Sequence, residues 1–293
     1  MTSTHAPALT GSGERFGVQR ALRTMRHHPL GLVGGLLLVL VVAFCLLGPL
    51  LHRTDQTDVD LVNAALPPSA AHPLGTDLKG FDVLGRLMAG GRVSLQIGLL
   101  SAAFATVIGT VYGAVAGLAG GVVDGFLMRV VDTLLSIPFL FFVLILSARF
   151  HANAVSLSLV IGAFSWLVSA RLVRGEVLTL RVREFVLAAR VMGASRRRLL
   201  FTHLVPNALS VIVVVITFQV ADAILVVAAL GFLGFGLTYP TADWGSQLAD
   251  GATYLSAGYW WLVYPVGLCI VLTVLGLNLL ADALRDALGR RAD

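Results

Sequence analysis

The residues of this 293-residue chain whose types and spacing suggest a function lie mostly between positions 171 and 206, and they suit contact with a partner. Apolar side chains at three- to four-residue spacing predict a short helix there: Phe185, Val186, Ala189 and Met192. Gly193 ends that helix, and Ser195 can cap a second one that opens on three arginines. Exposed apolar and basic side chains on two short helices are typical of a docking surface, although a basic loop that folds on itself would carry the same residues.

A second candidate is the carboxylate of Asp222, which lies in the middle of an apolar run with Gln219 one turn before it. An acidic side chain at membrane depth is costly, and it normally faces the interior of a helix bundle or an aqueous path. Asp222 therefore either lines a substrate route, where it would attract an amino group or a cation, or bonds to a neighbouring helix. Asp132, three residues after Arg129, is expected to form an ion pair on its own helix.

The sequence contains no motif for catalysis or nucleotide binding. No glycine-rich loop ends in Gly-Lys-Ser or Gly-Lys-Thr, so the phosphate-binding loop of ATPases is absent. No Ser–His–Asp arrangement or zinc-protease motif is present, and Cys45 and Cys269 both lie in apolar runs. We therefore expect that the chain is not an enzyme, that it binds no cofactor and no metal, and that any energy source is another polypeptide.

The composition indicates that membrane helices position these residues. Hydrophobic residues make up 57% of the chain and charged residues 13%, with a mean hydropathy of +0.87. Soluble domains average about 45–50% apolar and about 25% charged residues. The composition therefore excludes a disordered chain, a disulfide-rich scaffold and almost any soluble enzyme. The net charge of +5 then reflects cytoplasmic loops and gives no reason to expect nucleic-acid binding.

Six stretches nearly free of charge approach or exceed the roughly 20 apolar residues that a bilayer crossing takes. We expect an all-α, polytopic membrane protein with spans over residues 30–51, 93–117, 130–148, 155–170, 209–235 and 259–280. The first span is too long for a signal-peptide core and no small-residue cleavage site follows it, so we expect it to be retained. Residues 1–29 form a tail, either unstructured or with a surface-lying helix over residues 14–28.

The distribution of basic residues predicts the orientation of the spans. With six crossings, both chain ends lie on one side, and that side would carry fifteen arginines in the tail, the 171–206 loop and the C-terminus. The other side would carry five basic residues: Arg53, Lys79, Arg86, Arg92 and Arg149. Because basic residues accumulate in cytoplasmic loops, both termini and the 171–206 loop are expected in the cytoplasm.

Two features of the outer loops also carry structural predictions. Thr76 and Asp77 can cap a short interfacial helix whose apolar face includes Phe81. Trp244 lies in an aromatic-rich loop, where we expect it to anchor at the membrane interface.

Glycines in the second span repeat at every fourth residue, at Gly109, Gly113 and Gly117. This spacing lets two helix backbones approach closely, so it predicts a tight helix–helix contact.

The stretch from Phe185 to Ser195, followed by His203-Leu204-Val205-Pro206-Asn207, resembles the EAA loop of ABC importer permeases. The family's Ala, Gly and Pro positions correspond to Ala189, Gly193 and Pro206. Two positions depart, because Leu187 stands where the family usually has Glu and Val205 where it usually has Leu.

Further motifs resemble the peptide/nickel subfamily, and most closely the C-type subunit of dipeptide and oligopeptide importers. They extend over about residues 30–290 and include Leu74-Gly75-Thr76-Asp77, Gly91-Arg92-Val93-Ser94-Leu95, Phe232-Leu233-Gly234 and Asp282-Ala283-Leu284-Arg285-Asp286. The chain departs at Phe81, Val227 and Gly231, where the family usually has Arg, Glu and Ser.

The resemblance implies the type I ABC importer permease fold over residues 30–293, with a cytoplasmic coupling loop at about 171–206. The residues that it assigns to ATPase coupling are Glu184, Leu187, Ala188, Ala189, Gly193, Ala194, Ser195, Arg197 and Pro206, and the candidates for the substrate path are Gln219 and Asp222. It also implies a second homologous permease, two ATPase subunits that hold ATP and Mg²⁺, and an extracytoplasmic solute-binding protein, assembled in the inner membrane of a bacterium.

We expect the substrate of such an importer to be a peptide. An importer of nickel or another small solute is the alternative, although no His or Met cluster lies in the predicted spans. An ion-coupled secondary carrier would need more buried charges and usually an inverted repeat, and neither is evident. A membrane-embedded enzyme would need a catalytic constellation, which the sequence lacks.

Overall fold

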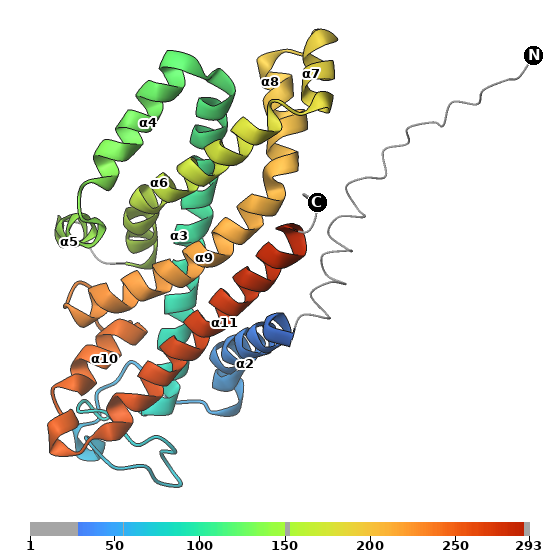
Figure 1. Cartoon of the computed structure of the whole chain (residues 1–293). Coiled ribbons are helices and arrows are strands. Elements are labelled where there is room, and N and C mark those ends of the chain that lie inside the picture. The colour runs from blue at the N-terminus through green and yellow to red at the C-terminus, as the bar shows by residue number, and fades with distance from the viewer. Residues whose placement is uncertain (1–28, 55, 150–152, 290–293) are drawn as a thin grey trace, which may run out of the picture.

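The computed structural model describes residues 29–54, 56–149 and 153–289, and within these ranges the chain is helical with no strand (Figure 1). The long helices are α2 (Pro29–Leu51), α3 (Val83–Ala119), α4 (Gly121–Leu135), α5 (Phe139–Arg149), α6 (Ala154–Leu180), α9 (Val205–Phe232) and α11 (Tyr264–Gly289). The shorter ones are α7 (Glu184–Val191), α8 (Arg196–Arg198), a π-helical turn (Leu199–Leu204), α10 (Trp244–Ala252) and three single turns (Leu61–Asn63, Leu255–Ala257, Trp260–Leu262). The surface helix predicted over residues 14–28 lies outside the described residues.

Helices α3 and α6 pack side by side along much of their length. A Cβ atom on Gly109 would lie 2.4 Å from the Cβ of Ser169, and one on Gly117 would lie 2.8 Å from a methyl group of Val177. The two helices therefore touch along the glycine stripe, which confirms the contact predicted from its spacing. Because both members of each contact advance in the same direction, α3 and α6 run parallel.

The predicted third span, residues 130–148, is not a single helix, and this prediction is wrong. Helix α4 ends at Leu135 and α5 begins at Phe139, and their axes are bent by 77°. Pro138 accounts for the break, since it has no N–H and disfavours helical backbone in the residue before it.

The number of crossings is nevertheless six within the described residues. Five helices are long and apolar enough to cross a membrane, and the bent α4–α5 pair makes a sixth crossing if counted as one span. The α4–α5 pair has to be one crossing, because α3 and α6 are parallel and the chain between them must return to the side of the membrane on which α3 began. The protein is therefore an all-α, multi-pass membrane protein.

Two ion pairs hold α4 against α6. The guanidinium of Arg174 donates to both carboxylate oxygens of Asp124, at 2.5 and 2.7 Å, and Arg171 donates to Asp132. The predicted pairing of Asp132 with Arg129 is wrong, because the partner comes from α6 and not from the same helix. The first half of the bent crossing is thus fastened to its neighbour by charge.

Helices α2 and α11 pack in antiparallel directions. A Cβ on Gly34 would lie 2.7 Å from the carbonyl oxygen of Gly276, whereas Cys45, further along α2, shares a core cluster with Val266 near the start of α11. The start of α2 therefore lies beside α11 towards its end, as Figure 1 shows. An even number of crossings requires this arrangement.

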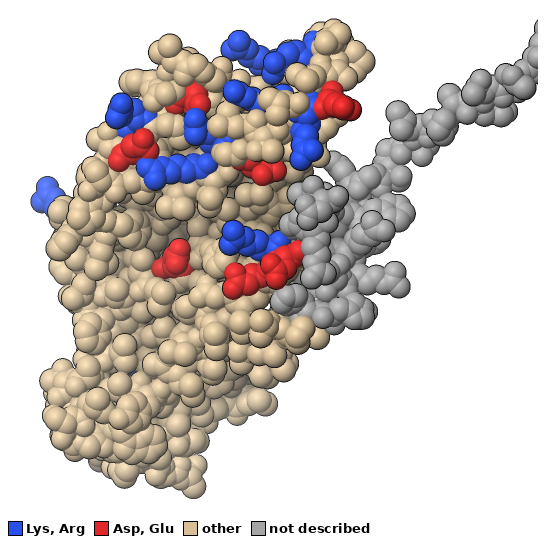
Figure 2. Space-filling model, viewed as in Figure 1, with Lys and Arg blue, Asp and Glu red and all other residues tan. Residues whose placement is uncertain are grey.

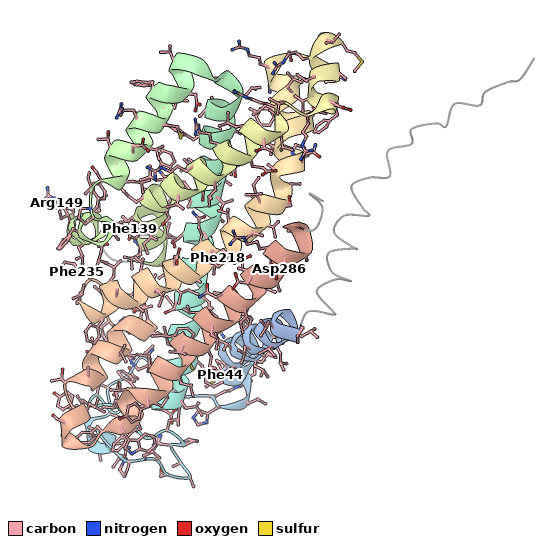
Figure 3. The ribbon with its side chains drawn as sticks, in the orientation of Figure 1. Phe44, Phe139, Arg149, Phe218, Phe235 and Asp286 are labelled. Atoms are coloured by element: carbon pink, nitrogen blue, oxygen red, sulfur yellow. The ribbon has the colours of Figure 1, made fainter. Side chains whose placement is uncertain are left out.

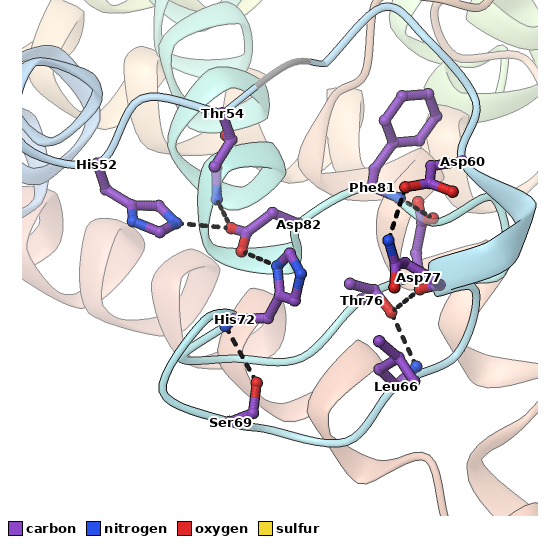
Figure 4. A network of polar contacts seen from close by, with 12 residues as sticks. His52, Thr54, Asp60, Leu66, Ser69, His72, Thr76, Asp77, Phe81 and Asp82 are labelled. Carbon is purple, nitrogen blue, oxygen red and sulfur yellow. Dashed lines mark hydrogen bonds and ion pairs between the residues drawn. The ribbon is translucent and has the colours of Figure 1, made fainter.

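The carboxylate of Asp82 organises the loop between α2 and α3 (Figure 4). It caps α3 by accepting a hydrogen bond from the N–H of Gly85 at 2.8 Å. Its two oxygens also lie 3.1 Å from Nε2 of His52 and 2.9 Å from Nδ1 of His72. One buried side chain thereby joins the end of α2, the loop and the start of α3.

Two predictions for the outer loops are wrong. Thr76 and Asp77 do not cap a helix, since they lie in irregular chain and α3 starts only at Val83. Trp244 is not an interfacial anchor, because it is completely buried and its indole N–H donates to the carbonyl oxygen of Leu87 at 3.0 Å. The tryptophan instead ties α10 to α3.

We expect Gly113→Ala to destabilise the protein, because the added Cβ would lie 2.3 Å from the carbonyl oxygen of Ala170 and would push α3 and α6 apart. The cost should be about 1–3 kcal/mol, as for other overpacked cores, and should lower the melting temperature of the purified protein in detergent. Gly175→Ala on α6 is the matched control, because nothing lies within 4 Å of its Cβ. That variant should melt at or above the wild-type temperature, and equal melting of the two variants would contradict the contact.

Candidate functional site

The first part of the candidate site is the α7–α8 loop, residues 181–204, and it is shorter than predicted. Helix α6 continues to Leu180, so Arg171 and Arg174 lie on that helix and outside the loop expected from residue 171. Helix α7 covers Glu184–Val191, as the apolar spacing predicted.

Gly193 makes the turn that follows α7. Its φ is +83°, which glycine adopts without steric cost, and a Cβ at this position would meet no atom within 4 Å. Glycine is therefore required here by backbone conformation and not by lack of space. The N–H of Ala194 closes the turn on the carbonyl oxygen of Ala189 at 3.0 Å, and the Ser195 hydroxyl accepts from the N–H of Arg198 at 3.3 Å. The predicted cap is confirmed.

The helix that Ser195 caps is not a separate element. Helix α8 continues through the π-helical turn into α9, so residues 196–232 form one 37-residue helical segment, with Pro206 in the first turn of α9. No loop therefore separates α8 from α9.

Helix α7 has a buried face and an exposed face. Val186 and Ala189 are buried in a core cluster that includes Leu204 of the π-helical turn. Ala189, which the resemblance assigns to ATPase coupling, thus packs inside its own chain, and its role in coupling stays a prediction. Leu187 and Ala188 face outward instead.

The outward surface of the α7–α8 loop is both apolar and basic. Val191 and Met192 are 88% and 80% exposed. The exposed arginines beside them are Arg190, Arg196, Arg197 and Arg198. Figure 2 shows charged side chains gathered over the end of the molecule that holds α7 and α8. Large apolar side chains among arginines suit neither lipid nor water, and this combination indicates a docking surface.

The second part of the candidate site is a cavity of about 1530 Å³ beside α9. Its walls come from the α4–α5 break, α6, the start of α7, α9 and the end of α11, and they include Phe139 and Phe218, which are labelled in Figure 3. The ionisable residues of the walls are Glu176, Arg183, Glu184, Asp222 and Arg285. Pockets for drug-sized ligands have volumes of about 300–1,000 Å³, so this cavity has room for a larger molecule.

Gln219 and Asp222 both line the cavity, one turn apart on α9. Only the side chain of Gln219 forms hydrogen bonds with other described residues. The amide oxygen of Gln219 accepts from the hydroxyl of Thr106 at 2.8 Å, and its nitrogen donates to the carbonyl oxygen of Ser165 at 2.8 Å and the hydroxyl of Ser169 at 2.6 Å. Asp222 is exposed, and no described residue bonds to its carboxylate. The bond from Asp222 to a neighbouring helix, one of the two interpretations above, is thus not formed within the described chain.

Sequence reasoning missed part of the cavity wall. Glu176 on α6, Arg183 just before α7 and Arg285 on α11 all line the cavity, although they lie far apart in the sequence. Glu184 was assigned to the coupling loop, and the structure also places it at the cavity. Among the described residues, no group of three or more His, Cys, Asp or Glu is placed to hold a metal ion.

Comparison with known protein families gives two matches. Residues 109–293 match the model of the binding-protein-dependent transport system inner membrane component. Residues 18–68 match the model of the N-terminal membrane domain of oligopeptide transport permease C.

Similar proteins cover nearly the whole chain. The oligopeptide transport system permease protein OppC of Bacillus subtilis is 37% identical over 290 residues, which cover 96% of this chain and 95% of that protein. The OppC protein of Escherichia coli K12 is 40% identical over 272 residues, which cover 92% of this chain and 90% of that protein. The probable D,D-dipeptide transport system permease protein DdpC of the same strain is 35% identical over 95% and 93%.

Adjacent alanines on α7 should respond differently to the same substitution. We expect Ala189→Glu to bury an unpaired carboxylate in the core cluster below α7, to cost more than about 2 kcal/mol, and to lower the yield and melting temperature of the protein. Ala188→Glu should leave both near the wild-type values, because its side chain points outward. If Ala188→Glu were the more damaging change, the buried face of α7 would be wrongly assigned.

Proposed function

The chain belongs to the family of inner membrane components of binding-protein-dependent transport systems, and on that basis we propose that it is one permease subunit of an ATP-driven peptide importer. It would lie in the inner membrane of a bacterium as a type I ABC importer permease. The chain itself catalyses no bond chemistry in this proposal.

The observation that carries the proposal is the continuous helical segment over residues 196–232. One end of it forms the exposed apolar and basic surface of the α7–α8 loop, and its middle lines the cavity. A partner that moves the loop therefore moves the cavity wall as well. Transport driven from outside the membrane requires such a mechanical link between an energy source and a path.

The energy source in this proposal is a pair of separate ATPase subunits, which bind ATP and Mg²⁺. They would dock on the α7–α8 loop through exposed side chains such as Leu187, Met192 and Arg197. Val186 and Ala189 hold α7 on the π-helical turn, so closure of the ATPases would be passed to α6 and α9 and would turn the cavity from one side of the membrane to the other.

We propose the remaining partners on the basis of the geometry and of the names of the relatives. This chain has one α7–α8 loop, while two ATPases need two docking points, so a second homologous permease would supply the other loop and face the cavity. An extracytoplasmic solute-binding protein would deliver the substrate, as the family description implies. The lipid bilayer surrounds the assembly, and nucleic acid has no role in it.

The lining of the cavity favours peptides over nickel. None of the described residues that line it is His, Cys or Met, the nitrogen and sulfur ligands that transition metals prefer. The cavity is also far larger than an aqua ion needs, and most of its wall is apolar. Relatives named as oligopeptide and D,D-dipeptide permeases support the same class of substrate.

The orientation in this proposal places both termini and the α7–α8 loop in the cytoplasm. The bias of arginines towards that end supports it. A cysteine introduced at Arg197 should react with a membrane-impermeant thiol reagent only from the cytoplasmic side, and one at Asp58 or Asp250 only from outside. Labelling of Arg197→Cys in intact cells would overturn both the topology and the docking surface.

Coupling should depend on the conformation of Gly193. Gly193→Val cannot adopt a φ of +83° without strain, so α7 should be misdirected while chain abundance stays near normal. We expect peptide uptake to fall at least about tenfold and the ATPases to co-purify in lower yield. Gly193→Asn is the matched control, because Asn tolerates positive φ, and it should retain most of the uptake. Wild-type uptake by Gly193→Val with its ATPases bound would refute the role of the loop.

A further inference from the structure

One face of α9 lines the cavity over most of the length of the helix. The lining residues of α9 recur at three- to four-residue spacing from Asn207 to Val226. Asn207 and Asp222 are separated by fifteen residues, which at 1.5 Å per residue places them about 22 Å apart along the helix. Between them the wall is mainly apolar and includes Val214 and Phe218. The cavity therefore offers a long apolar face with different chemistry at its two ends.

The end at Asp222 carries an acidic side chain without a partner among the described residues, on a helix that is held in place one turn earlier. No described residue bonds to the Asp222 carboxylate, which is exposed. Gln219, one turn earlier, is fastened to α3 through Thr106 and to α6 through Ser169, so α9 is held at this level. A carboxylate on a rigid helix is prepared for a cationic ligand without further ordering.

The other end of the cavity carries charges of both signs. Glu176, Arg183, Glu184 and Asn207 line that end, and Arg285 lines the wall from α11, eight residues beyond Leu277, which shares a core cluster with Ala221. Guanidinium groups bind carboxylates through paired hydrogen bonds, so this end can take the negative end of a ligand. Its formal charges cancel, whereas the end at Asp222 is purely negative.

We propose that this cavity holds an extended oligopeptide whose free amino terminus pairs with Asp222 and whose carboxyl end lies near Arg183 and Arg285. The inference rests on the proposed function as a peptide permease and adds the length and direction of the bound chain. Extended chain covers about 3.3–3.6 Å per residue, so a span of about 22 Å corresponds to about six residues. Apolar side chains of the peptide would pack on the valine and phenylalanine wall.

A metal cation is a poor alternative at Asp222. Hard cations such as Ca²⁺ take six to eight oxygen ligands, and Asp222 belongs to no group of three potential metal ligands within the described residues. An ammonium group needs only one carboxylate and hydrogen-bond acceptors around it. The site therefore suits an amine.

Photo-crosslinking tests the direction of the peptide. The complex would be purified through this chain, with its partner permease and ATPases, and placed in nanodiscs without nucleotide. Apolar hexapeptides would carry a diazirine-leucine at either the first or the last position. We expect the first-position probe to label the stretch 218–226 and the last-position probe to label the region of Arg183, Asn207 and Arg285. The reverse pattern, or identical labelling by the two probes, would overturn the inference.

A pair of charge variants tests the role of Asp222. Binding of a fluorescent hexapeptide with a free amino terminus should weaken about tenfold in Asp222→Asn, while the same peptide with an acetylated amino terminus should bind wild type and variant equally. Glu176→Gln removes the same charge from the other end of the cavity, and it should leave the preference for the free amine intact. An unchanged affinity in Asp222→Asn, or an equal loss in Glu176→Gln, would refute the pairing.

Peptide uptake into vesicles separates this inference from the function on which it rests. If the reconstituted complex imports peptides but neither probe labels the cavity, the bound orientation proposed here is wrong and the function as a peptide permease stands. If the reconstituted complex imports no peptide with any extracytoplasmic binding protein of its own organism, the proposed function itself fails.

Discussion

The parallel contact between α3 and α6 is the constraint on which the rest of the structure depends. Three glycines bring the two helices together so closely that their missing Cβ atoms would fall on atoms of α6. Parallel neighbours cannot be joined by a short turn, so the intervening chain has to recross the bundle, which it does as the bent pair α4–α5. The ion pairs of Asp124 and Asp132 with arginines of α6 fasten that return to the same helix. The loop and the helix that follow α6 start from the position that this contact fixes.

Two different kinds of interaction then connect the loop to the cavity. At the loop, α7 is held by apolar packing, with Val186 and Ala189 on the π-helical turn. In the middle of the membrane, α9 is held by a polar hub at Gln219, whose amide binds partners on both α3 and α6. Hydrogen bonds made away from water are costly to break, since the freed groups find no other partner. We infer that α9 keeps its register on α3 and α6 and moves with them as one body.

The sequence was sufficient for those features that depend on local pattern. The six crossings, the glycine stripe, helix α7, the turn at Gly193 and the cap at Ser195 were all predictable, because each reflects periodicity or a backbone preference of nearby residues. Features that depend on a distant partner were not. Asp132 pairs with Arg171 and not with Arg129, and Trp244 is buried by α3, although nothing near either residue indicates so. Ala188 and Ala189 are neighbours in the sequence but lie on the exposed and the buried face of α7. Which of the two is buried depends on the rotation of this short helix about its axis, and a resemblance between sequences does not give that rotation. Pro138 indicates the bend in the sequence, but an average of hydropathy over a window of about 20 residues does not register a single proline.

The break between α4 and α5 has a consequence for the solvent inside the protein. The carbonyl oxygens of Asp132, Thr133 and Leu134 at the end of α4 accept hydrogen bonds from the N–H groups of Ser136 and Ile137, so the first N–H groups of α5 are the ones without a partner inside a helix, and the break lies within a crossing of the membrane. Irregular backbone at that depth is tolerated only where protein buries it or a hydrated space adjoins it. Ile137, Pro138 and Phe139 line the cavity, so water that enters the cavity reaches these backbone groups. A solute that enters would therefore meet polar backbone groups at the break in addition to the apolar wall, and it would displace the water that those groups bind.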